Sequence, residues 1–410
     1  MKIGVVADDH TGATDVALAL FQSGLTVDIH FGPPTPETVV SAQPDAVVIG
    51  LKTRTAPSAE AVKRSTQAGK WLLELGASML YYKYCSTFDS TRSGNIGPIL
   101  DALSDLTGVP NSVTTPATPE HGRTVEGGDL FVFGVPLDQT SMRHHPLTPM
   151  TDANVPRLLS AQTKRPVHML DEAGSASATR RDDGYLVADA MTDEDLLRVA
   201  AQTRSDRLVS GAAGLARALG QVLRSEASAP ATGSHVRSAS GSSDRAAVLV
   251  GSASARTREQ LAHVREAGLP LHQIDLLADS SAAVLARIAL DWFETLATDT
   301  AAYFVGSLEP DQVRVVQERI GKDRSADLLE KTLGHIAVGL RDRGTKRIIV
   351  AGGETSGAVT TALGVKHGTI TGVATTGVPW IYTHSSAIGL TIALKSGNFG
   401  APNFLVEAAR

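Results

Sequence analysis

The chain contains 410 residues, of which 42% are hydrophobic and 20% are charged, a composition typical of globular enzymes. This length exceeds that of one ordinary hydrophobic core, so we expect two domains. The formal net charge of −5 argues against a nucleic acid or an anionic membrane as the main partner, and the single cysteine excludes an intrachain disulfide framework.

The N-terminal apolar run breaks at Asp8 and Asp9, which is unlike a signal peptide. The sequence has no uncharged apolar run of about 18 residues, the length that a membrane-spanning helix requires. We therefore expect a cytoplasmic protein.

The first half of the chain alternates strand-like runs with helix-like segments. Residues 2–9 form a β-branched run that ends in carboxylates, and residues 11–24 then show helical spacing that closes on a glycine. The runs at 45–55 and 78–87 repeat the theme of an apolar strand that leads into a polar loop. Further strand-like runs occupy residues 130–137 and 206–214. This alternation predicts a parallel α/β sheet.

A stretch of small and polar residues at 225–244 shows no apolar periodicity, which is typical of a flexible linker. After it, patterns of strand, glycine-rich turn and helix begin again at 245–264 and 346–364. We therefore expect two α/β domains with mostly parallel sheets, joined by a flexible linker rich in Ser, Ala and Gly. The expected bounds are 1–224 for the first domain, 225–245 for the linker and 246–410 for the second domain.

Polar loops follow three expected strands of the first domain, at residues 8–15, 52–55 and 83–95. In open α/β sheets, ligands bind where the carboxyl ends of the strands meet their loops, so we expect these loops to share one cleft. The third loop lies within KYCSTFDSTRSGNIGP, residues 83–98, which carries five Ser or Thr hydroxyls, an Asp, an Asn and two basic side chains. A simple turn does not need this hydrogen-bonding capacity, so we expect a polar ligand here.

Asp8 and Asp9 end the first expected strand. Adjacent strand residues point to opposite faces, so one carboxylate is expected to face the cleft and the other to cap the helix or bind backbone. A cleft carboxylate could take a proton from a substrate hydroxyl or hold a metal ion. N-capping by Asp together with the Thr11 hydroxyl is the structural alternative.

Two turns of the second domain have the character of phosphate-binding turns. Residues 351–359, AGGETSGAV, place glycines after a strand and hydroxyls at the start of a helix, whose free N–H groups favour an anion. Residues 250–260, VGSASARTREQ, offer a second such turn with Ser252 and Ser254. A tight turn with a Ser or Thr cap is the alternative, and the sequence contains neither a Walker A pattern nor a G-x-G-x-x-G after a strand.

Residues 142–154 contain His144, His145 and Asp152. Adjacent histidines rarely place both rings on one metal, and no third His or Cys follows at ligand spacing. We therefore favour a substrate-contacting or interdomain loop over a transition-metal site. Cys85 lacks the flanking pattern of a nucleophile and is interpreted as a small buried thiol.

Six ordered motifs resemble the four-carbon acid sugar kinase family over nearly the whole chain. They are ADDHTGATD, KTRT, KYCSTFDSTRSGNIGP, GSASARTREQ, GGETSGAV and ALKSGNFG. Within the family, MRHHPLTPMTDAN, GVPW and LKSGNFG look most like the 3-oxo-tetronate 4-kinase branch, with threonate and erythronate kinases as related alternatives. His10 departs from the family, in which Phe or another apolar residue is frequent at this position.

The resemblance implies an ATP-dependent kinase that phosphorylates the terminal hydroxyl of a four-carbon sugar acid, with the acid on the first domain and ATP on the second. It implies no dedicated metal ligand, because Mg²⁺ would be held through the ATP phosphates. The expected partners are the sugar acid and ATP, without nucleic acid or membrane, and a homo-oligomer is left open. A non-catalytic regulatory protein that binds the same ligands is the alternative of another class. The missing dinucleotide motif disfavours a dehydrogenase.

Carried onto this sequence, the resemblance implies three groups of site residues. The candidates for catalysis are Asp8, Asp9 and Asp89. The candidates for substrate binding are Arg54, Lys83, Ser86, Thr87, Asn95, Arg123 and His144. The candidates for ATP binding are Ser252, Ser254, Gly352, Gly353, Glu354, Thr355, Ser356, Gly357 and Gly397.

Two roles within these groups are assigned by preference. Asp8 is slightly preferred as the base, because it lies nearer the end of the strand. Among Arg54, Lys83 and Arg92, Arg54 is preferred as the clamp on the substrate carboxylate, because an Arg fork binds a carboxylate through two bonds and Arg54 ends a strand-like segment at the same cleft.

Overall fold

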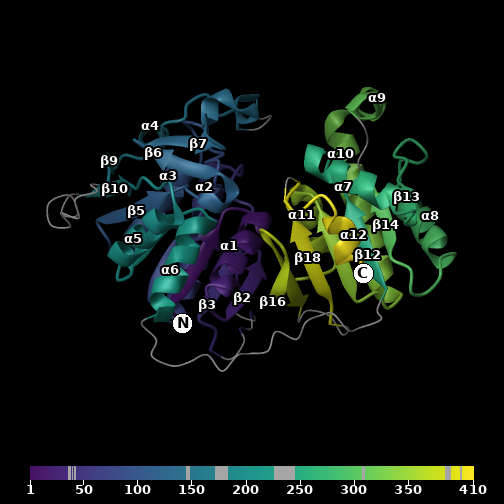
Figure 1. Cartoon of the computed structure of the whole chain (residues 1–410), viewed down its shortest axis with the longest axis horizontal. Helices are drawn as coiled ribbons and strands as arrows, with labels where there is room; N and C mark the ends of the chain where they lie inside the picture. Colours follow the sequence, from purple (N-terminus) through teal and green to yellow (C-terminus); the bar gives the residue numbers. More distant parts are fainter. Residues whose placement is uncertain are drawn as a thin grey trace. The chain divides into compact units, whose positions relative to one another are not determined.

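The structure is a computed structural model of the chain, and it describes residues 1–35, 38, 40, 43–144, 148–170, 183–225, 245–306, 310–383, 389–397 and 399–410. The chain forms two compact units, Met1–Thr232 and Gly233–Arg410, which we call unit 1 and unit 2 (Figure 1). Residues 226–244 of the expected linker lie outside the described residues. The linker and the expected domain bounds therefore stay predictions.

The main sheet of unit 1 is parallel throughout. Its strands are β1 (Ile3–Ala7), β2 (Val27–Phe31), β3 (Ala46–Gly50), β4 (Met79–Lys83), β5 (Asn111–Thr115), β9 (Val167–Met169), β10 (Gly184–Val187) and β11 (Leu208–Gly211). They lie in the order β2-β3-β1-β4-β11-β5-β10-β9, and all neighbours run parallel. Every residue of β1, β3 and β4 is buried, as expected of a parallel sheet covered on both faces.

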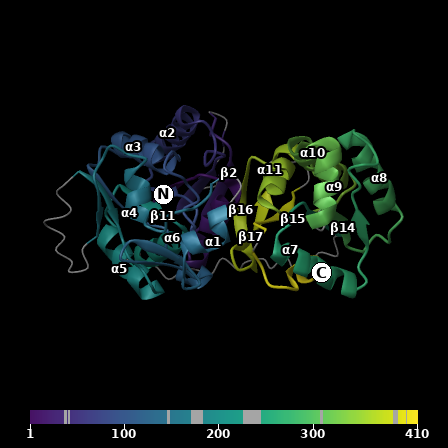
Figure 2. The ribbon, with the colours of Figure 1, turned by 90° about the horizontal axis from the view of Figure 1, so that it is seen from above.

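Helices provide that cover. They are α1 (His10–Gln22), α2 (Ser58–Glu74), α3 (Ile96–Thr107), α4 (Val155–Ser160), α5 (Asp193–Thr203) and α6 (Ala213–Ser225), with short 3₁₀ turns η1 (Pro119–His121), η2 (Leu137–Gln139) and η3 (Ser141–His144). Figure 2 shows α2 and α3 on one face of the sheet and α1, α5 and α6 on the other.

A small antiparallel sheet of unit 1 differs from the expectation. It contains β6 (Arg123–Glu126), β7 (Asp129–Val132) and β8 (Val135–Pro136). The run at 130–137 was expected to be a single strand, but it is divided between β7 and β8. Phe133 and Gly134 separate the two strands with φ angles of 50° and 77°, the left-handed backbone that a tight two-residue hairpin turn requires.

Unit 2 is also an α/β unit. Its strands are β12 (Ala246–Val250), β13 (Leu271–Gln273), β14 (Ala302–Val305), β15 (Arg347–Ala351), β16 (His367–Thr375), β17 (Val378–Thr383) and β18 (Thr391–Lys395). They lie in the order β13-β14-β12-β15-β18-β17-β16. The pairs from β13 to β18 are parallel, whereas β17 runs antiparallel to both of its neighbours. The expectation of two α/β domains with mostly parallel sheets is confirmed.

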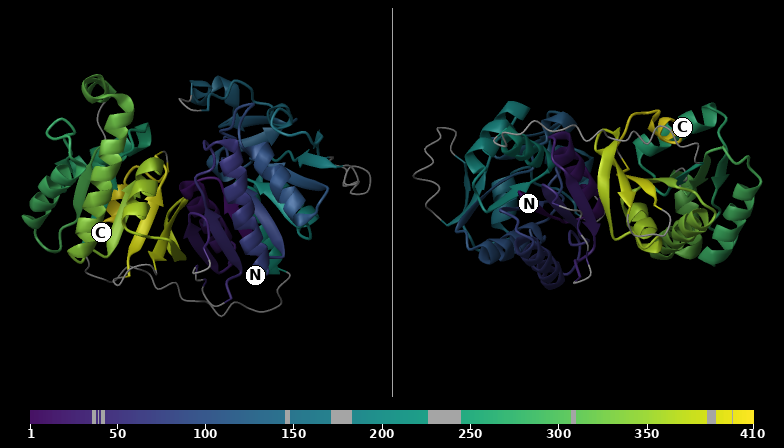
Figure 3. Two further views of the ribbon diagram at one scale, coloured as in Figure 1. Left: turned by 180° about the vertical axis from the view of Figure 1, so that it is seen from behind. Right: turned by 90° about the horizontal axis from the view of Figure 1, so that it is seen from below.

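The helices of unit 2 are α7 (Ala255–Glu266), α8 (Ala282–Glu294), α9 (Pro310–Ile320), α10 (Lys322–Asp342), α11 (Gly353–Ala362) and α12 (Phe404–Ala408). Helices α8, α10 and α11 pack together on one face of the sheet, and α7 and α12 on the other. The two views in Figure 3 show these layers from behind and from below. Within the described ranges of both units, no helix is long and apolar enough to cross a membrane.

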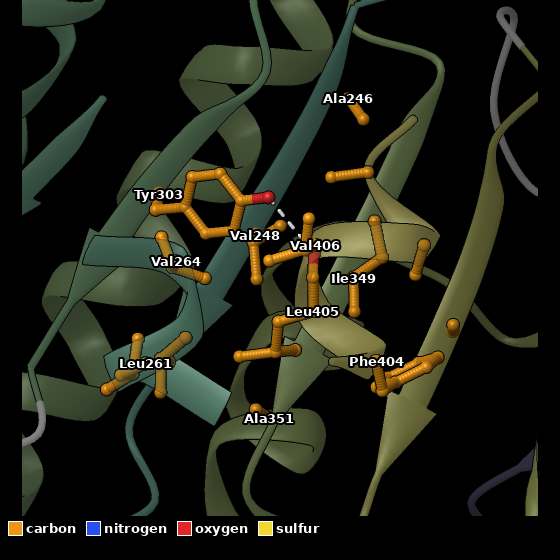
Figure 4. Close-up of a cluster of buried hydrophobic side chains, with 14 of the residues drawn as sticks. Ala246, Val248, Leu261, Val264, Tyr303, Ile349, Ala351, Phe404, Leu405 and Val406 are labelled. Atoms are coloured by element: carbon orange, nitrogen blue, oxygen red, sulfur yellow. Dashed lines mark hydrogen bonds between the residues drawn. The ribbon is translucent and has the colours of Figure 1, made fainter. Parts of the chain in front are cut away.

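A hydrophobic cluster fixes α12 onto the sheet of unit 2 (Figure 4). Val248, Ile349 and Leu405 are fully buried in it. Tyr303 of β14 lies in the same cluster, and its hydroxyl donates to the carbonyl of Leu405 over 3.0 Å. Burial raises the pKa of Tyr303 to about 12, so the hydroxyl keeps the proton that this hydrogen bond needs at neutral pH.

We predict that Tyr303→Phe lowers the free energy of unfolding of unit 2 by about 1–3 kcal/mol, because the buried Leu405 carbonyl loses this donor. Hydrogen exchange of peptides from β14 and α12 measures the effect locally. Exchange at the wild-type rate in both elements would contradict the prediction.

Candidate active site

The loops that follow β1, β3 and β4 meet at the carboxyl edge of the unit 1 sheet. Strand β1 lies between β3 and β4. The backbone N–H of Asp8 donates to the carbonyl of Lys83 over 3.0 Å, and the carbonyl of Asp8 accepts from the N–H of Thr53 over 2.9 Å. The three polar loops that the sequence indicated therefore lie together.

The guanidinium of Arg54 binds three carboxylates at this edge. Its Nε and Nη2 donate to Oδ2 and Oδ1 of Asp8 over 2.8 and 2.9 Å, which is a bidentate pair. Nη2 also lies 2.9 Å from Oδ1 of Asp9, and Nη1 donates to Oδ2 of Asp89 over 3.3 Å. One cation thus joins carboxylates from two loops.

Burial and charge pairing act in opposite directions on this cluster. Burial raises the pKa of Asp8, which is only 2% exposed, and the charge of Arg54 offsets part of this effect. Burial alone would lower the pKa of Arg54, but the charges of Asp8 and Asp9 raise it well above its ordinary value. The guanidinium therefore stays charged and provides the counter-charge that buried Asp8 requires.

Asp9 caps helix α1. Its backbone is extended at φ −146°, and its side chain accepts from the N–H of Gly12 over 2.8 Å and from the Thr11 hydroxyl over 2.7 Å. Burial acts to raise the Asp9 pKa, but the charges of Arg54 and Lys83 and these hydrogen bonds lower it. A Cβ on Gly12 would lie 2.3 Å from Oδ1 of Asp9, so this cap needs a glycine there. Asp9 thus provides the expected cap, and the expectation that Asp8 faces a cleft stays a prediction.

Lys83 supplies a second buried cation. Its Nζ donates to the carbonyl of Tyr84 over 2.8 Å and lies 3.9 Å from Oδ2 of Asp15 on α1. Burial raises the pKa of Asp15, and the charge of Lys83 acts against that rise. Lys83 therefore links the end of β4 to α1.

Shortly after Lys83 the chain makes a turn at residues 86–87, which the bridge between Cys85 and Phe88 closes. Sγ of Cys85 lies 3.1 Å from Oγ1 of Thr87, and Ser86 between them is half-buried. Burial raises the pKa of the Cys85 thiol, which keeps it protonated and therefore a weak nucleophile. Cys85 is partly buried rather than fully buried as expected, and its raised pKa agrees with the absence of a nucleophile pattern.

The turn leads into two strained residues. Phe88 and Asp89 have φ angles of 59° and 48°, in the left-handed region that non-glycine residues rarely adopt. Such strain persists only where surrounding contacts impose it, and it gathers at functional sites. Asp89 has such contacts, because its carboxylate accepts from the Thr148 hydroxyl as well as from Arg54.

Asn95 braces the loop that carries Arg54. Its Nδ2 donates to the carbonyls of Thr53 and Ala56, each over 2.8 Å, and to that of Arg54 over 3.3 Å. Because its amide protons are engaged within the chain, Asn95 positions Arg54 in this structure. Its expected contact with substrate stays a prediction.

Arg123 begins β6, on the segment that follows β5. Its guanidinium donates to the carbonyl of His121 and lies 5.4 Å from the centre of the Phe133 ring. Nε of Arg123 is buried and has no hydrogen-bond partner among the described residues. Burial lowers the pKa of Arg123, although Cys85 and Asp15 act against that shift.

The remaining candidates of unit 1 that the sequence indicated are Arg92, His144, His145 and Asp152. Arg92 is exposed. His144 ends the turn η3, and His145 lies outside the described residues. The carboxylate of Asp152 accepts from Nη2 of Arg157 over 2.6 Å at the surface.

The candidate nucleotide loops of unit 2 follow β12, β15 and β18, which are adjacent in the sheet. The N–H groups of Gly251 and Ser252 donate to the carbonyl of Ala351 over 3.0 and 3.1 Å. The N–H of Gly352 donates to the carbonyl of Lys395 over 2.9 Å. The three loops therefore form one hydrogen-bonded edge, as those of unit 1 do.

Glycines let these loops pack closely. A Cβ on Gly251 would lie 2.1 Å from Oγ1 of Thr355, and one on Gly397 would lie 2.6 Å from Oγ of Ser252. Gly352 has a φ of 129°, which a side chain would disfavour. Glycines at these positions therefore let the hydroxyls of Ser252 and Thr355 pack directly against the backbone of this edge.

The two helix starts at this edge differ. Ser254 caps α7, because its hydroxyl accepts from the N–H of Thr257 over 3.3 Å. Among the residues that the structure describes, no side chain caps α11, which begins after Gly352 with exposed Gly353 and Glu354. The buried residues Thr355, Ser356 and Gly357 follow in its first turns. Its uncapped N–H groups make the start of α11 the better anion-binding position.

Sequence reasoning missed Lys395, the last residue of β18. Its ammonium is buried and donates to Oγ1 of Thr257 over 3.1 Å and to the carbonyls of Ser396 and Gly397 over 3.0 and 2.8 Å. Burial, together with the charge of Arg256, lowers its pKa to about 7. The available signal was a lysine at the end of the strand in ALKSGNFG, from which only Gly397 was selected.

Comparison with known proteins assigns the chain to a family. Residues 3–219 match the family model of a sugar-binding N-terminal domain, and residues 247–405 match that of a nucleotide-binding C-terminal domain. The chain is 40% identical to the 3-oxo-tetronate kinase of Cupriavidus necator, over 100% of this chain and 96% of that protein. It belongs to the four-carbon acid sugar kinase family.

Two further relatives support this membership. The 3-oxo-tetronate kinase of Burkholderia multivorans is also 40% identical, again over 100% of this chain and 96% of that protein. A crystal structure from Salmonella typhimurium LT2, provisionally described as a tRNA synthase, has a TM-score of 0.89 and 35% identity over 100% of this chain and 99% of that chain. In this member of the kinase family, the carboxylate cluster falls within the sugar-binding match and the glycine-rich edge within the nucleotide-binding match.

The structure brings only some of the candidate residues of this family member into direct contact. Asp8, Asp9, Arg54 and Asp89 form one ion-paired cluster. Arg123 forms no hydrogen bond or ion pair to that cluster within the described residues. The functional role of each residue stays a prediction.

The lowered pKa of Lys395 gives a pH-dependent prediction. Between about pH 7 and its ordinary pKa of 10.5, the unfolded chain holds more protons at this lysine than the folded chain does. Stability rises with pH wherever the unfolded state binds more protons. The free energy of unfolding of wild type should therefore rise from pH 7 to pH 9 relative to that of Lys395→Met, which does not titrate. Urea unfolding at both pH values measures this difference, and an equal difference at both would contradict the prediction.

Proposed function

We propose that the protein is an ATP-dependent kinase that transfers a phosphoryl group to the terminal hydroxyl of a four-carbon sugar acid, with 3-oxo-tetronate as the preferred substrate. The observation that carries the proposal is the likeness, at 40% identity and over the full chain, to proteins named 3-oxo-tetronate kinase. Threonate and erythronate are the alternative substrates of the same class. The net charge of −5 gives no support to an RNA substrate of the kind that the description of the Salmonella protein names.

The edge of unit 1 suits a small, highly polar substrate. Each buried polar group of such a substrate needs a partner, because an unpaired one costs about 1–3 kcal/mol. The loops around Arg54, Lys83 and Thr87 gather cations, carboxylates and hydroxyls at the ends of adjacent strands. In this proposal the substrate hydroxyls bind to this edge.

The edge of unit 2 suits the phosphates of ATP. The uncapped start of α11 offers N–H groups, and Gly251 and Gly397 stand where a side chain would collide with Ser252 or Thr355. The buried amine of Lys395 lies behind these loops and adds positive charge there in its protonated form. The residues present therefore fit a nucleotide, and bound Mg-ATP supplies the transferable phosphoryl group.

Phosphoryl transfer requires the protein mainly to position the hydroxyl and to accept its proton. Within the cluster, Asp9 is engaged as the cap of α1, and Asp8 is held through both oxygens by Arg54. Asp89 meets Arg54 through Oδ2 only, at 3.3 Å, accepts from the neutral Thr148 hydroxyl through Oδ1, and stands on strained backbone. In this proposal Asp89 accepts the proton, in preference to Asp8, and Arg54 orients its carboxylate.

The first test is ADP release by the purified protein with Mg-ATP and a panel of four-carbon acids. We expect turnover with 3-oxo-tetronate well above that with threonate, erythronate or glycerate, because the likeness to 3-oxo-tetronate kinases extends over the whole chain. A preference for threonate or erythronate would keep the reaction and change the substrate. ADP release at background level with every acid would refute the kinase proposal, and binding of the acid without turnover would favour a regulatory protein.

The assignment of the base predicts that Asp89→Asn lowers kcat by about 10²–10⁴-fold while KM changes little, because the amide cannot accept the proton. Asp105→Asn is a matched control, since Asp105 pairs with Arg165 at the surface and is 73% exposed. Steady-state kinetics with 3-oxo-tetronate measure the effect. Wild-type kcat in a folded Asp89→Asn enzyme would remove Asp89 from this role.

A further inference from the structure

The carboxylate of a sugar acid needs a cation that is not already neutralised. The sequence favoured Arg54 for this task. In the structure, however, Nε, Nη1 and Nη2 of Arg54 all contact carboxylates, those of Asp8, Asp9 and Asp89. A substrate carboxylate placed against Arg54 would meet three like charges, which repel it. Arg54 is therefore poorly suited to bind the acid group.

Arg123, unlike Arg54, has more hydrogen-bond donors than acceptors around it. Its guanidinium makes one hydrogen bond, to the carbonyl of His121, and no carboxylate within the described residues pairs with it. Its Nε is buried without a partner. Buried donors are nearly always satisfied in native proteins, so an unsatisfied one indicates a missing acceptor. The edge formed by Nε and Nη2 is the same edge that Arg54 uses to hold Asp8 in bidentate fashion.

Arg123 is also held firmly at the carboxyl edge of the sheet. The backbones of Thr118 and Arg123 exchange two hydrogen bonds, over 2.8 and 3.1 Å, shortly after the end of β5. Nη1 is fixed by His121, and the Phe133 ring lies 5.4 Å from the guanidinium carbon, within the range of a cation–π contact. Asp15 of α1, whose carboxylate lies 3.9 Å from the ammonium of Lys83 at this same edge, acts electrostatically on Arg123. The guanidinium is therefore preorganised beside the polar loops.

We propose that Arg123 binds the carboxylate of the sugar acid through its Nε–Nη2 edge and thereby selects an acid over the neutral sugar of the same length. This inference rests on the proposed function, because it names the group that reads the substrate of that reaction. A purely structural role, in which Arg123 only balances the charge of Asp15, is the competing explanation.

The test compares wild type with Arg123→Gln and Arg123→Lys in the full chain. The acid substrate is 3-oxo-tetronate, and the neutral probe is erythrulose, which carries CH₂OH in place of the carboxylate. Arg198→Gln is the matched control, because Arg198 pairs with Asp195 at the surface and is 69% exposed. Binding is measured by calorimetry without ATP, and KM and kcat are measured with Mg-ATP.

We expect Arg123→Gln to raise both Kd and KM for 3-oxo-tetronate by about 10- to 100-fold, the usual loss of a charge-assisted contact. Its kcat should stay within about 3-fold of wild type, and erythrulose should bind as it does to wild type. For Arg123→Lys, Kd and KM for 3-oxo-tetronate should lie between those of wild type and those of Arg123→Gln, because lysine keeps the positive charge and loses the bidentate fork. Arg198→Gln should match wild type.

Three results would overturn the inference. They are an unchanged Kd for the acid in Arg123→Gln, an equal loss for acid and neutral probe, or a lower kcat at unchanged KM. If Arg123→Gln does not fold, Arg123→Lys carries the same comparison. Failure of the proposed function looks different: wild type would bind the acid and release no ADP, while the loss of acid binding in Arg123→Gln would still support the role of Arg123.

Discussion

The ion cluster around Arg54 is the constraint on which the sugar-binding edge of unit 1 depends. Asp8 is almost fully buried, and a buried carboxylate is tolerated only with a counter-charge close by. Arg54 supplies that charge from the loop after β3, and the same guanidinium reaches Asp89 on the loop after β4. Asn95 then holds the Arg54 loop by its carbonyls. Loops that are distant in sequence are thereby locked together, since movement of one would leave buried charge uncompensated.

Unit 2 uses a buried cation in a different way. Lys395 donates to a hydroxyl and to backbone carbonyls, which carry no net charge, whereas Arg54 donates to carboxylates. This difference explains why the pKa of Lys395 falls on burial while the pKa of Arg54 rises. The two edges therefore also differ in how their positive charge is paired. The charge of Arg54 is cancelled within unit 1, but no carboxylate within the described residues pairs with Lys395, so any charge it carries is available to attract an anion such as phosphate.

Much of this architecture could be predicted from the sequence, because strands, caps and loop positions are set by local patterns. The β-branched run that ends at Asp8 and Asp9 indicated both β1 and the cap of α1. The partners of each side chain could not be predicted. Residue type marked Arg54 and Asn95 as donors, but only the folded chain shows that their donors are already engaged. The turn at Phe133 and Gly134 was missed because the apolar run was read as one strand across its glycine, and a left-handed backbone carries no signal at a phenylalanine. Lys395 was missed because a lysine at a strand end usually points to solvent.

At the unit 1 edge, whether a cation can bind an anionic substrate depends more on its unpaired donors than on its residue type. Asp8, Asp9, Asp15 and Asp89 gather there around Arg54 and Lys83. Burial raises the pKa of Asp8 and of Asp15, and the carboxylates gathered here outnumber these two cations, so the edge is not rich in free positive charge. An anionic substrate therefore gains little from the two cations that the sequence makes most conspicuous. A cation that lies outside the cluster and keeps an unpaired buried donor changes this balance, and Arg123 is placed to do so. In the site that we propose, the carboxylates orient the hydroxyls of the substrate, and recognition of its acid group falls to a separate segment after β5.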